Sequence, residues 1–346
     1  MPKHKVLFFL TLIYLLALSL RLWFIKDGTF AFGYDQARDA VYAQEILDGN
    51  LKIFGPTASG TNDTVFHGVA YYYVLAFLHL FSENPLIVDL LLAVVTSLSI
   101  VPIYLLAQYL TKKNSFGLIA ALLAAVSYEQ IIAGTWLSNP ALAVLTLPCF
   151  MYFFLKLADH FNYKNMFYCM LFLGLSVQFI FFEIYWLMAP MALFVYQLAI
   201  NHWRIKSQQL KIWLMGAGIF LLVISSMILA EWIMVTRGIL TPQSILTFNT
   251  GDAKTPFDHL LAVMRLWVNK ASFSMSPRIG LLNLTALFLC LFKFKGKLRL
   301  KFFWCLFFTP LCFLLLYYRD NSHLLIAYES LFYVLTVVVL SNFFKK

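Results

Sequence analysis

Charged residues are scarce in this chain. Only 12% of the 346 residues are Asp, Glu, Lys or Arg, whereas 62% are hydrophobic. A soluble domain carries about 25% charged residues. The composition therefore excludes an ordinary soluble protein and predicts an all-α, polytopic integral membrane protein. The sequence also lacks a long soluble domain, a low-complexity tract and a clear internal repeat.

Several motifs of known chemistry are missing as well. There is no Gly-rich phosphate loop and no H-E-x-x-H sequence, so we expect no nucleotide-phosphate site and no zinc-protease site of those types. The five cysteines lie inside apolar runs without metal-ligand spacing and indicate neither zinc nor disulfides. The first apolar run is not followed by an A-x-A-like cleavage site, which favours a retained anchor over a removed signal peptide.

The apolar runs that are present predict about ten transmembrane helices. A span needs about 20 mainly apolar residues. The candidate spans are residues 6–25, 86–110, 116–135, 139–158, 165–182, 184–200, 212–236, 277–292, 302–317 and 324–343. The run 67–82 is shorter and carries three successive tyrosines, which is typical of an interfacial or half-inserted helix. No span is interrupted by a Gly/Pro break of the kind common in transporters.

The distribution of basic residues predicts the orientation. If 67–82 does not cross, 16 of the 26 Lys and Arg residues fall in segments on one side, and Asp159 is the only acid among them. Lys and Arg accumulate on the cytoplasmic side of membrane proteins. We therefore expect both termini in the cytoplasm and the functional residues on the outer face, mainly in segments 26–85 and 237–276. The net charge of +10 is explained by this bias, so we expect no nucleic-acid partner.

The densest ionisable stretch before the C-terminal third is residues 33–48, directly after the first span. Asp35, Arg38 and Asp39 would share one edge of a helix, because positions i, i+3 and i+4 are neighbours. An acid held just above the bilayer could take a proton from a substrate hydroxyl. Two alternatives are open: Asp35 caps a helix, or the stretch is simply a solvated interfacial helix.

Other polar residues near the predicted outer face are candidates for ligand contacts. Acids at membrane depth are energetically costly and usually face a cavity or a partner. Glu183, Glu231 and Asn139 could contact a sugar or an acceptor, or could serve only structural purposes. Arg237, Arg319 and His323 are basic against the charge bias, so they could bind an anionic phosphate, lipid head groups or nearby acids.

The order of several short motifs resembles a known group, the GT-C glycosyltransferases that use polyprenyl-phosphate sugars. The matching branch is the bacterial protein mannosyltransferase-like group related to glycosyltransferase family 39. The motifs are Tyr34-Asp35-Gln36-Ala37 with Ala43 and Ile46, Gly55-Pro56, Gly68 with Tyr71-Tyr72-Tyr73, and Trp136 with Asn139-Pro140. The resemblance covers roughly residues 6–200.

This resemblance implies a membrane enzyme, a hexosyl- or pentosyltransferase, that moves a sugar from a polyprenyl-phosphate donor to a hydroxyl acceptor (a glycan, lipid or protein). It implies that Asp35 is the general base of an inverting displacement, with Arg38, Asp39 and His67 supporting it. The basic residues Arg319, His323 and Arg237 would then bind the donor phosphate. No cofactor is required, and a divalent metal (Mg²⁺ or Mn²⁺) is compatible with the site but not demanded by it.

The resemblance also implies a layout and a location. Residues 1–236 would form a GT-C-like transmembrane module that includes outer loop 26–85, and residues 237–346 an outer segment followed by C-terminal spans. The partners would be the lipid-linked donor, an unidentified acceptor and membrane lipids, in a bacterial or archaeal cell (inner) membrane. The alternatives are another polyprenyl-linked glycan enzyme, such as an O-antigen ligase or polymerase, and a transporter or flippase. An inactive relative is a third alternative.

Overall fold

A computed structural model describes residues 1–26, 32–57, 66–238, 256–271 and 328–343, together with single positions at 278, 280, 281, 284, 285, 306 and 309. The described residues form helices, and the only extended pairing among them is one antiparallel bridge between Thr57 and Phe66. The all-α prediction is therefore confirmed. The helices are α1 (Lys3–Ile25), α2 (Tyr34–Leu47), α3 (Ala70–His79), α4 (Pro85–Ser97), α5 (Ile100–Thr111), α6 (Asn114–Ala125), α7 (Tyr128–Gly134), α8 (Pro140–Asp159), α9 (Tyr163–Phe179), η1 (Phe181–Leu187), α10 (Met188–Ile200), α11 (Ser207–Val223), α12 (Ser225–Thr236), α14 (Pro256–Ala271) and α17 (Glu329–Phe343).

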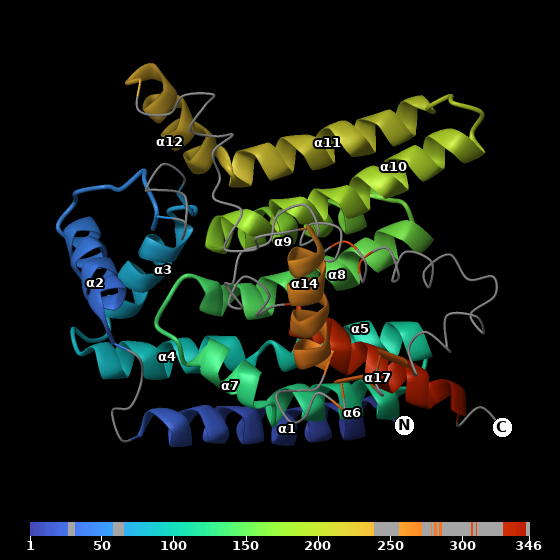
Figure 1. The fold of residues 1–346 in the computed structure, drawn as a ribbon, viewed down its shortest axis with the longest axis horizontal. Coiled ribbons are helices and arrows are strands. Elements are labelled where there is room, and N and C mark those ends of the chain that lie inside the picture. The colour runs from blue at the N-terminus through green and yellow to red at the C-terminus, as the bar shows by residue number, and fades with distance from the viewer. Residues whose placement is uncertain are drawn as a thin grey trace.

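The long helices lie side by side, from α1 at one edge to α11 at the other, and α2, α3 and α12 gather at one end (Figure 1). Helix α8 is central, since 72% of its apolar window is buried, whereas only 11% of α1 is. The outward side chains of α1 are large and apolar, including Leu7, Phe8 and Leu15. Such a surface is suited to lipid rather than to water.

Four of the described helical segments are long and apolar enough to cross a membrane, and up to six if two bent pairs each count as one span. The four are Lys3–Ile25, Pro85–Thr111, Pro140–Asp159 and Phe181–Ile200. The membrane prediction is thus confirmed, whereas the number of ten spans and the division at residue 236 stay predictions. The spans expected at 277–292 and 302–317 lie outside the described residues, apart from single positions.

Helix α3 is the short helix expected in the run 67–82. It has ten residues, and at 1.5 Å per residue it reaches only about 15 Å, half the thickness of the hydrocarbon core. It is therefore too short to cross. Together with α2 it forms the pair of short helices in the first loop.

Two spans that the sequence presents as continuous are broken. Helices α6 and α7 meet at 65°, and α11 and α12 meet at 63°. The breaks fall at Val126-Ser127 and at Ile224, where there is neither Gly nor Pro, so the spans expected to be continuous at 116–135 and 212–236 are each bent. Side chains stabilise both breaks: the Ser127 hydroxyl accepts a hydrogen bond from the Gln130 N–H at 3.4 Å, and the Gln178 amide donates to the Val223 carbonyl at 2.6 Å.

Gln178 also fastens the first loop to the membrane helices. Its side-chain nitrogen donates to the Ser226 hydroxyl (3.0 Å), and its side-chain oxygen accepts from the Ala70 N–H (3.3 Å). The Gly68 N–H donates to its backbone carbonyl at 2.7 Å. This close approach requires a glycine, because a Cβ at Gly68 would overlap the Gln178 side chain and lie 2.7 Å from its Cα.

We predict that Gly68→Ala destabilises the protein by about 1–3 kcal/mol, the usual cost of overpacking a well-packed interior. Gln178 cannot move aside without losing its hydrogen bonds at the α11–α12 break. The measurement is the midpoint of thermal unfolding in detergent. Gly218→Ala is the matched control, since a Cβ there meets nothing within 4 Å. Equal midpoints for the two variants would contradict the packing argument.

Candidate functional site

The start of α2 places the first cluster of ionisable groups. Gly33 occupies the position before the helix, and its N–H donates to the side-chain oxygen of Gln36 at 2.9 Å. Gln36 therefore closes the first turn, which leaves the Asp35 carboxylate free of any capping hydrogen bond. The alternative in which Asp35 caps the helix is not what the structure describes. Its position in the first turn nevertheless suits a negative charge, because the helix dipole is positive there.

Arg38 lies between two carboxylates. Its Nη1 is 3.0 Å from Asp35 Oδ1, while its Nε and Nη2 donate to Asp39 Oδ1 at 2.9 and 2.8 Å. The two acids differ in exposure: the Asp35 side chain is 66% exposed and that of Asp39 only 2%. Asp39 is thus an internal anchor for Arg38, and Asp35 is the acid that outside molecules can reach.

The pKa shifts of the groups around Asp39 agree with its role as the internal partner of Arg38. Burial raises the pKa of the Asp39 carboxyl, and the hydrogen bonds from Arg38 oppose that rise. Burial lowers the pKa of Arg38, but its hydrogen bonds and charge pairing with Asp39 raise it more, so the net direction is upward. Burial, followed by the nearby charge of Asp39, raises the pKa of Tyr72. Arg38 therefore remains a cation and Tyr72 a hydroxyl donor at any physiological pH.

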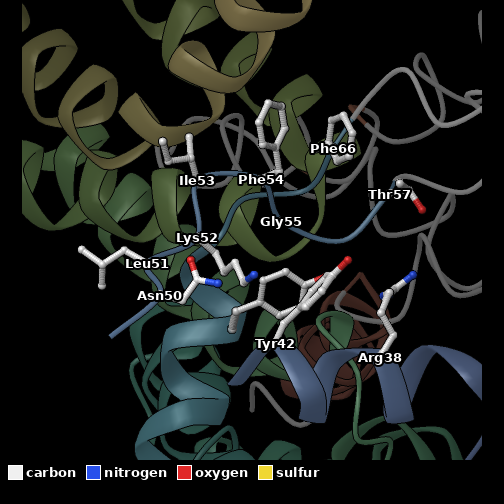
Figure 2. A pocket seen from close by; sticks show the side chains of 11 residues that line it. Arg38, Tyr42, Asn50, Leu51, Lys52, Ile53, Phe54, Gly55, Thr57 and Phe66 are labelled. Atoms are coloured by element: carbon white, nitrogen blue, oxygen red, sulfur yellow. The ribbon is translucent and has the colours of Figure 1, made fainter. Parts of the chain in front are cut away.

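A pocket of about 390 Å³ lies beside this cluster, between α2, α3 and the extended segment 50–57 (Figure 2). Its charged lining residues are Arg38 and Lys52, and the rest are mostly aromatic or aliphatic. The Tyr42 and Tyr72 rings meet edge to face at 5.3 Å, and the Lys52 ammonium lies 4.7 Å from the centre of the Tyr42 ring. The full lining is Arg38, Tyr42, Asn50, Leu51, Lys52, Ile53, Phe54, Gly55, Thr57, Phe66 and Tyr72.

Figure 2 shows Tyr42 and Arg38 on one side of this pocket and Phe54 and Phe66 on the other. The latter two rings pack edge to face at 5.1 Å. Lys52 forms an ion pair with Glu45 of α2, so each of the two cations lining the pocket has an acid beside it. The sequence analysis did not single out Lys52, Tyr42, Phe54 or Phe66. Lys52 and Phe54 lie directly before Gly55-Pro56 and Tyr42 lies in the ionisable stretch 33–48, which were the available signals, whereas no motif pointed to Phe66.

His67 does not line the pocket. It is buried, its Nδ1 accepts a hydrogen bond from the Phe181 N–H at 2.8 Å, and its own N–H donates to the Pro56 carbonyl at 2.8 Å. These contacts join the end of the first loop to η1. They place His67 behind the pocket wall, as a support.

The other predicted contact residues are dispersed. Asn139 is buried and donates to the Phe179 carbonyl at the end of α9, and Glu183 is fully buried beside Trp186. Neither lines the pocket. Glu231 of α12 is half-buried and does not line the pocket. Arg237 is exposed just after α12 and is not part of the pocket, and Arg319 and His323 lie outside the described residues.

The described residues around Asp35 do not form a metal site. No group of three His, Cys, Asp or Glu side chains in the described part of the chain is arranged to hold a metal ion. Moreover, the carboxylates of Asp35 and Asp39 both bind the Arg38 guanidinium. A divalent ion between them would have to displace a cation that is already paired with both.

Comparisons with known proteins agree with the architecture. A family model described as dolichyl-phosphate-mannose-protein mannosyltransferase matches residues 67–229. The crystal structure of ArnT from Cupriavidus metallidurans bound to undecaprenyl phosphate superposes with a TM-score of 0.58 at 13% sequence identity. The match covers 98% of this chain and 60% of the ArnT chain, so this chain spans about three fifths of that protein's length. No curated protein matches the sequence.

We predict that Asp39→Ala destabilises the fold by about 1–3 kcal/mol, because it leaves a partly buried guanidinium without its internal partner. Asp35→Asn is the control and should cost less than about 1 kcal/mol, since exposed ion pairs contribute little. Thermal unfolding of the purified variants in detergent measures both effects. The assignment of Asp39 as the anchor is wrong if Asp35→Asn proves the more destabilising change.

Proposed function

The chain is an integral membrane protein with the GT-C fold, and on that premise we propose that it is a glycosyltransferase that takes one sugar from a polyprenyl-phosphate donor. The observation that carries the proposal is the exposed Asp35 carboxylate. It is held by Arg38, and Arg38 lines a pocket of about 390 Å³. The lipid carrier is suggested by the ArnT structure, which contains undecaprenyl phosphate, and by the description of the matching family.

Asp35 would act as the general base. Its carboxylate takes the proton of the acceptor hydroxyl while the hydroxyl oxygen attacks the anomeric carbon of the donor sugar. The bond between that carbon and the phosphate oxygen breaks, and polyprenyl phosphate leaves with the electron pair. A single displacement inverts the anomeric carbon. Arg38 fixes the carboxylate of Asp35 by its 3.0 Å contact, and Asp39 in turn fixes Arg38.

The pocket suits the sugar end of a substrate better than the lipid chain. Small-molecule sites usually measure about 300–1,000 Å³ and combine apolar walls with a few polar groups. At about 390 Å³ this pocket lies at the lower end of that range. The rings of Tyr42 and Tyr72 offer apolar surfaces to a sugar, and Asn50 and Lys52 offer hydrogen-bond donors. The polyprenyl chain would then run along the lipid-facing helices.

The residues that neutralise the leaving phosphate remain candidates. Arg319, His323 and Arg237 were predicted for this role because they are basic residues expected on the outer face. A reaction on that face, with both termini in the cytoplasm of a bacterial or archaeal cell, belongs to the same proposal. It is supported by the clustering of Lys and Arg in the alternate loops. The proposal covers a hexosyl or a pentosyl donor, and a glycan, lipid or protein acceptor.

One observation favours the rival function of a transporter or flippase. Such proteins bind substrates at discontinuous helices, and two spans of this chain are bent by 65° and 63°. Here, however, the breaks are filled from within the protein. Gln178 occupies the α11–α12 break, and the Tyr333 hydroxyl bonds to Ser127 at the α6–α7 break. Occupation of both breaks by buried side chains favours the transferase.

We predict that Asp35→Asn lowers sugar transfer by about 10²–10⁴-fold, the usual contribution of a general base. The change keeps the size of the side chain and removes only its basicity. The measurement is release of polyprenyl phosphate from a panel of polyprenyl-phosphate sugars in sealed membranes.

Asp48→Asn is the matched control, because Asp48 is an exposed acid at the other end of α2 and should leave transfer unchanged. Undiminished turnover in Asp35→Asn would move the base elsewhere. If the wild-type protein consumes no donor of the panel, the transporter becomes the better account.

We also predict that transfer continues at the same rate after treatment with EDTA. Arg38 already supplies the positive charge beside Asp35, and the described residues there offer no metal cluster. The check is the initial rate with and without chelator at equal ionic strength. A loss that Mg²⁺ or Mn²⁺ restores would overturn this mechanism and assign the ion to residues outside the described part of the chain.

A further inference from the structure

The three successive tyrosines at the start of α3 have different surroundings. Consecutive residues of an α-helix project about 100° apart, so the three rings cannot share one face. Tyr71 is buried in the core, and Tyr72 lines the pocket. The Tyr73 hydroxyl instead reaches the first loop and donates to the backbone carbonyl of Lys52 at 3.0 Å. Tyr73 is therefore the member of the three whose contact bears on the loop rather than on the core.

Lys52 is the cation of the loop wall of the pocket. Its ammonium forms an ion pair with Glu45 and lies 4.7 Å from the centre of the Tyr42 ring, both residues of α2. Figure 2 shows the Lys52 side chain reaching toward Tyr42 inside the pocket. Helix α2 thus holds the charged end of Lys52, but it does not bind the backbone from which that side chain starts.

The backbone around Lys52 has few other supports. Among the described residues, the backbone of residues 51–55 forms no backbone–backbone hydrogen bond, whereas Asn50 on one side and Pro56 on the other each form one. The bond from Tyr73 falls between these two points. Because the lysine stem is long and flexible, its ammonium has a defined position only if its backbone is held as well. Helices α2 and α3 therefore hold Lys52 at both ends, the first by its side chain and the second by its carbonyl.

We propose that Tyr73 is a positioning residue, which holds the Lys52 carbonyl and so fixes the Lys52 ammonium in the substrate pocket. Tyr73 does not line the pocket, so it acts on the substrate through Lys52. The kinetic consequence of this assignment rests on the proposed function. The contact itself is independent of any activity.

The activity-independent test is the rate at which a water-soluble acylating reagent modifies Lys52, followed by mass spectrometry on the full-length protein in detergent. Tyr73→Phe removes one hydroxyl and keeps the ring, so the fold is retained. It should speed modification of Lys52 by about two- to tenfold, the factor that corresponds to the loss of one ordinary hydrogen bond. Exposed Lys164 is the internal reference, and its rate should not change.

A second variant shows that the assay responds to the position of Lys52. Glu45→Gln removes the charge of the ion pair and should also speed the modification. If Glu45→Gln speeds it and Tyr73→Phe leaves it at the wild-type rate, the proposal is overturned.

The kinetic test separates positioning from chemistry. Tyr73→Phe should raise KM for the donor or the acceptor by about two- to tenfold while kcat stays within a small factor, because only binding geometry is altered. The matched control is Tyr163→Phe, which removes the same hydroxyl from an exposed tyrosine at the start of α9, outside the pocket lining. An equal fall of kcat and kcat/KM in Tyr73→Phe would instead assign its hydroxyl to the transition state and contradict the proposal.

A double-mutant cycle tests whether Tyr73 acts through Lys52. In a Lys52→Met background, Tyr73→Phe should change KM little further, since the ammonium that it positions is gone. Fully additive effects on KM would overturn this route of action.

The two assays also distinguish this proposal from the proposed function. A wild type without transferase activity, combined with faster modification of Lys52 in Tyr73→Phe, would refute the transferase and leave the positioning of Lys52 standing. An active wild type whose Lys52 reactivity and KM are both unaffected by Tyr73→Phe would refute the positioning role and leave the transferase standing.

Discussion

Inside a membrane every backbone N–H and C=O needs a protein partner, because hydrocarbon offers none. Where a span breaks, some backbone N–H and C=O groups lose their partners in the helix, so other parts of the protein must bind them. Here side chains from other helices bind at the two breaks: Gln178 of α9 bonds to Val223 and Ser226, and the Tyr333 hydroxyl of α17 bonds to Ser127. Each polar side chain that completes a break thereby joins elements far apart in the sequence.

The hydrogen bonds of these buried polar side chains also hold the walls of the pocket in place. Gln178, which completes the α11–α12 break, also binds Ala70 and packs against Gly68, so the end of the first loop is fixed to the membrane helices. The opposite wall is fixed by Asp39, which is almost fully buried and bonds to Arg38. The pocket therefore lies between two walls, each held by a buried polar side chain.

The roles of the acids follow from their depth. A buried carboxylate stays in place by binding its neighbours, which suits Asp39 as an anchor. A base must be able to reach its substrate, which suits Asp35 with its 66% exposed side chain. His67 and Asn139 both bind backbone groups: His67 accepts from the Phe181 N–H, and Asn139 donates to the Phe179 carbonyl. Inside a membrane, backbone N–H and C=O groups that lack a helix partner must find a hydrogen-bond partner within the protein.

The sequence by itself determined what depends on composition and on near neighbours. Apolar runs predicted membrane helices, the short run 67–82 predicted the non-spanning α3, and the spacing of Asp35, Arg38 and Asp39 predicted that they share one edge of a helix. Only the tertiary structure decided that Asp39 is the buried partner, that two spans break without Gly or Pro, and that Phe54 and Phe66 face Arg38 across a pocket. The physical reason is the separation along the sequence of the residues that are in contact. Periodicity and i, i+3 spacing act within one or two turns of a helix, whereas the contacts that attach the first loop to the membrane helices join residues more than a hundred positions apart, such as Ala70 with Gln178 and His67 with Phe181.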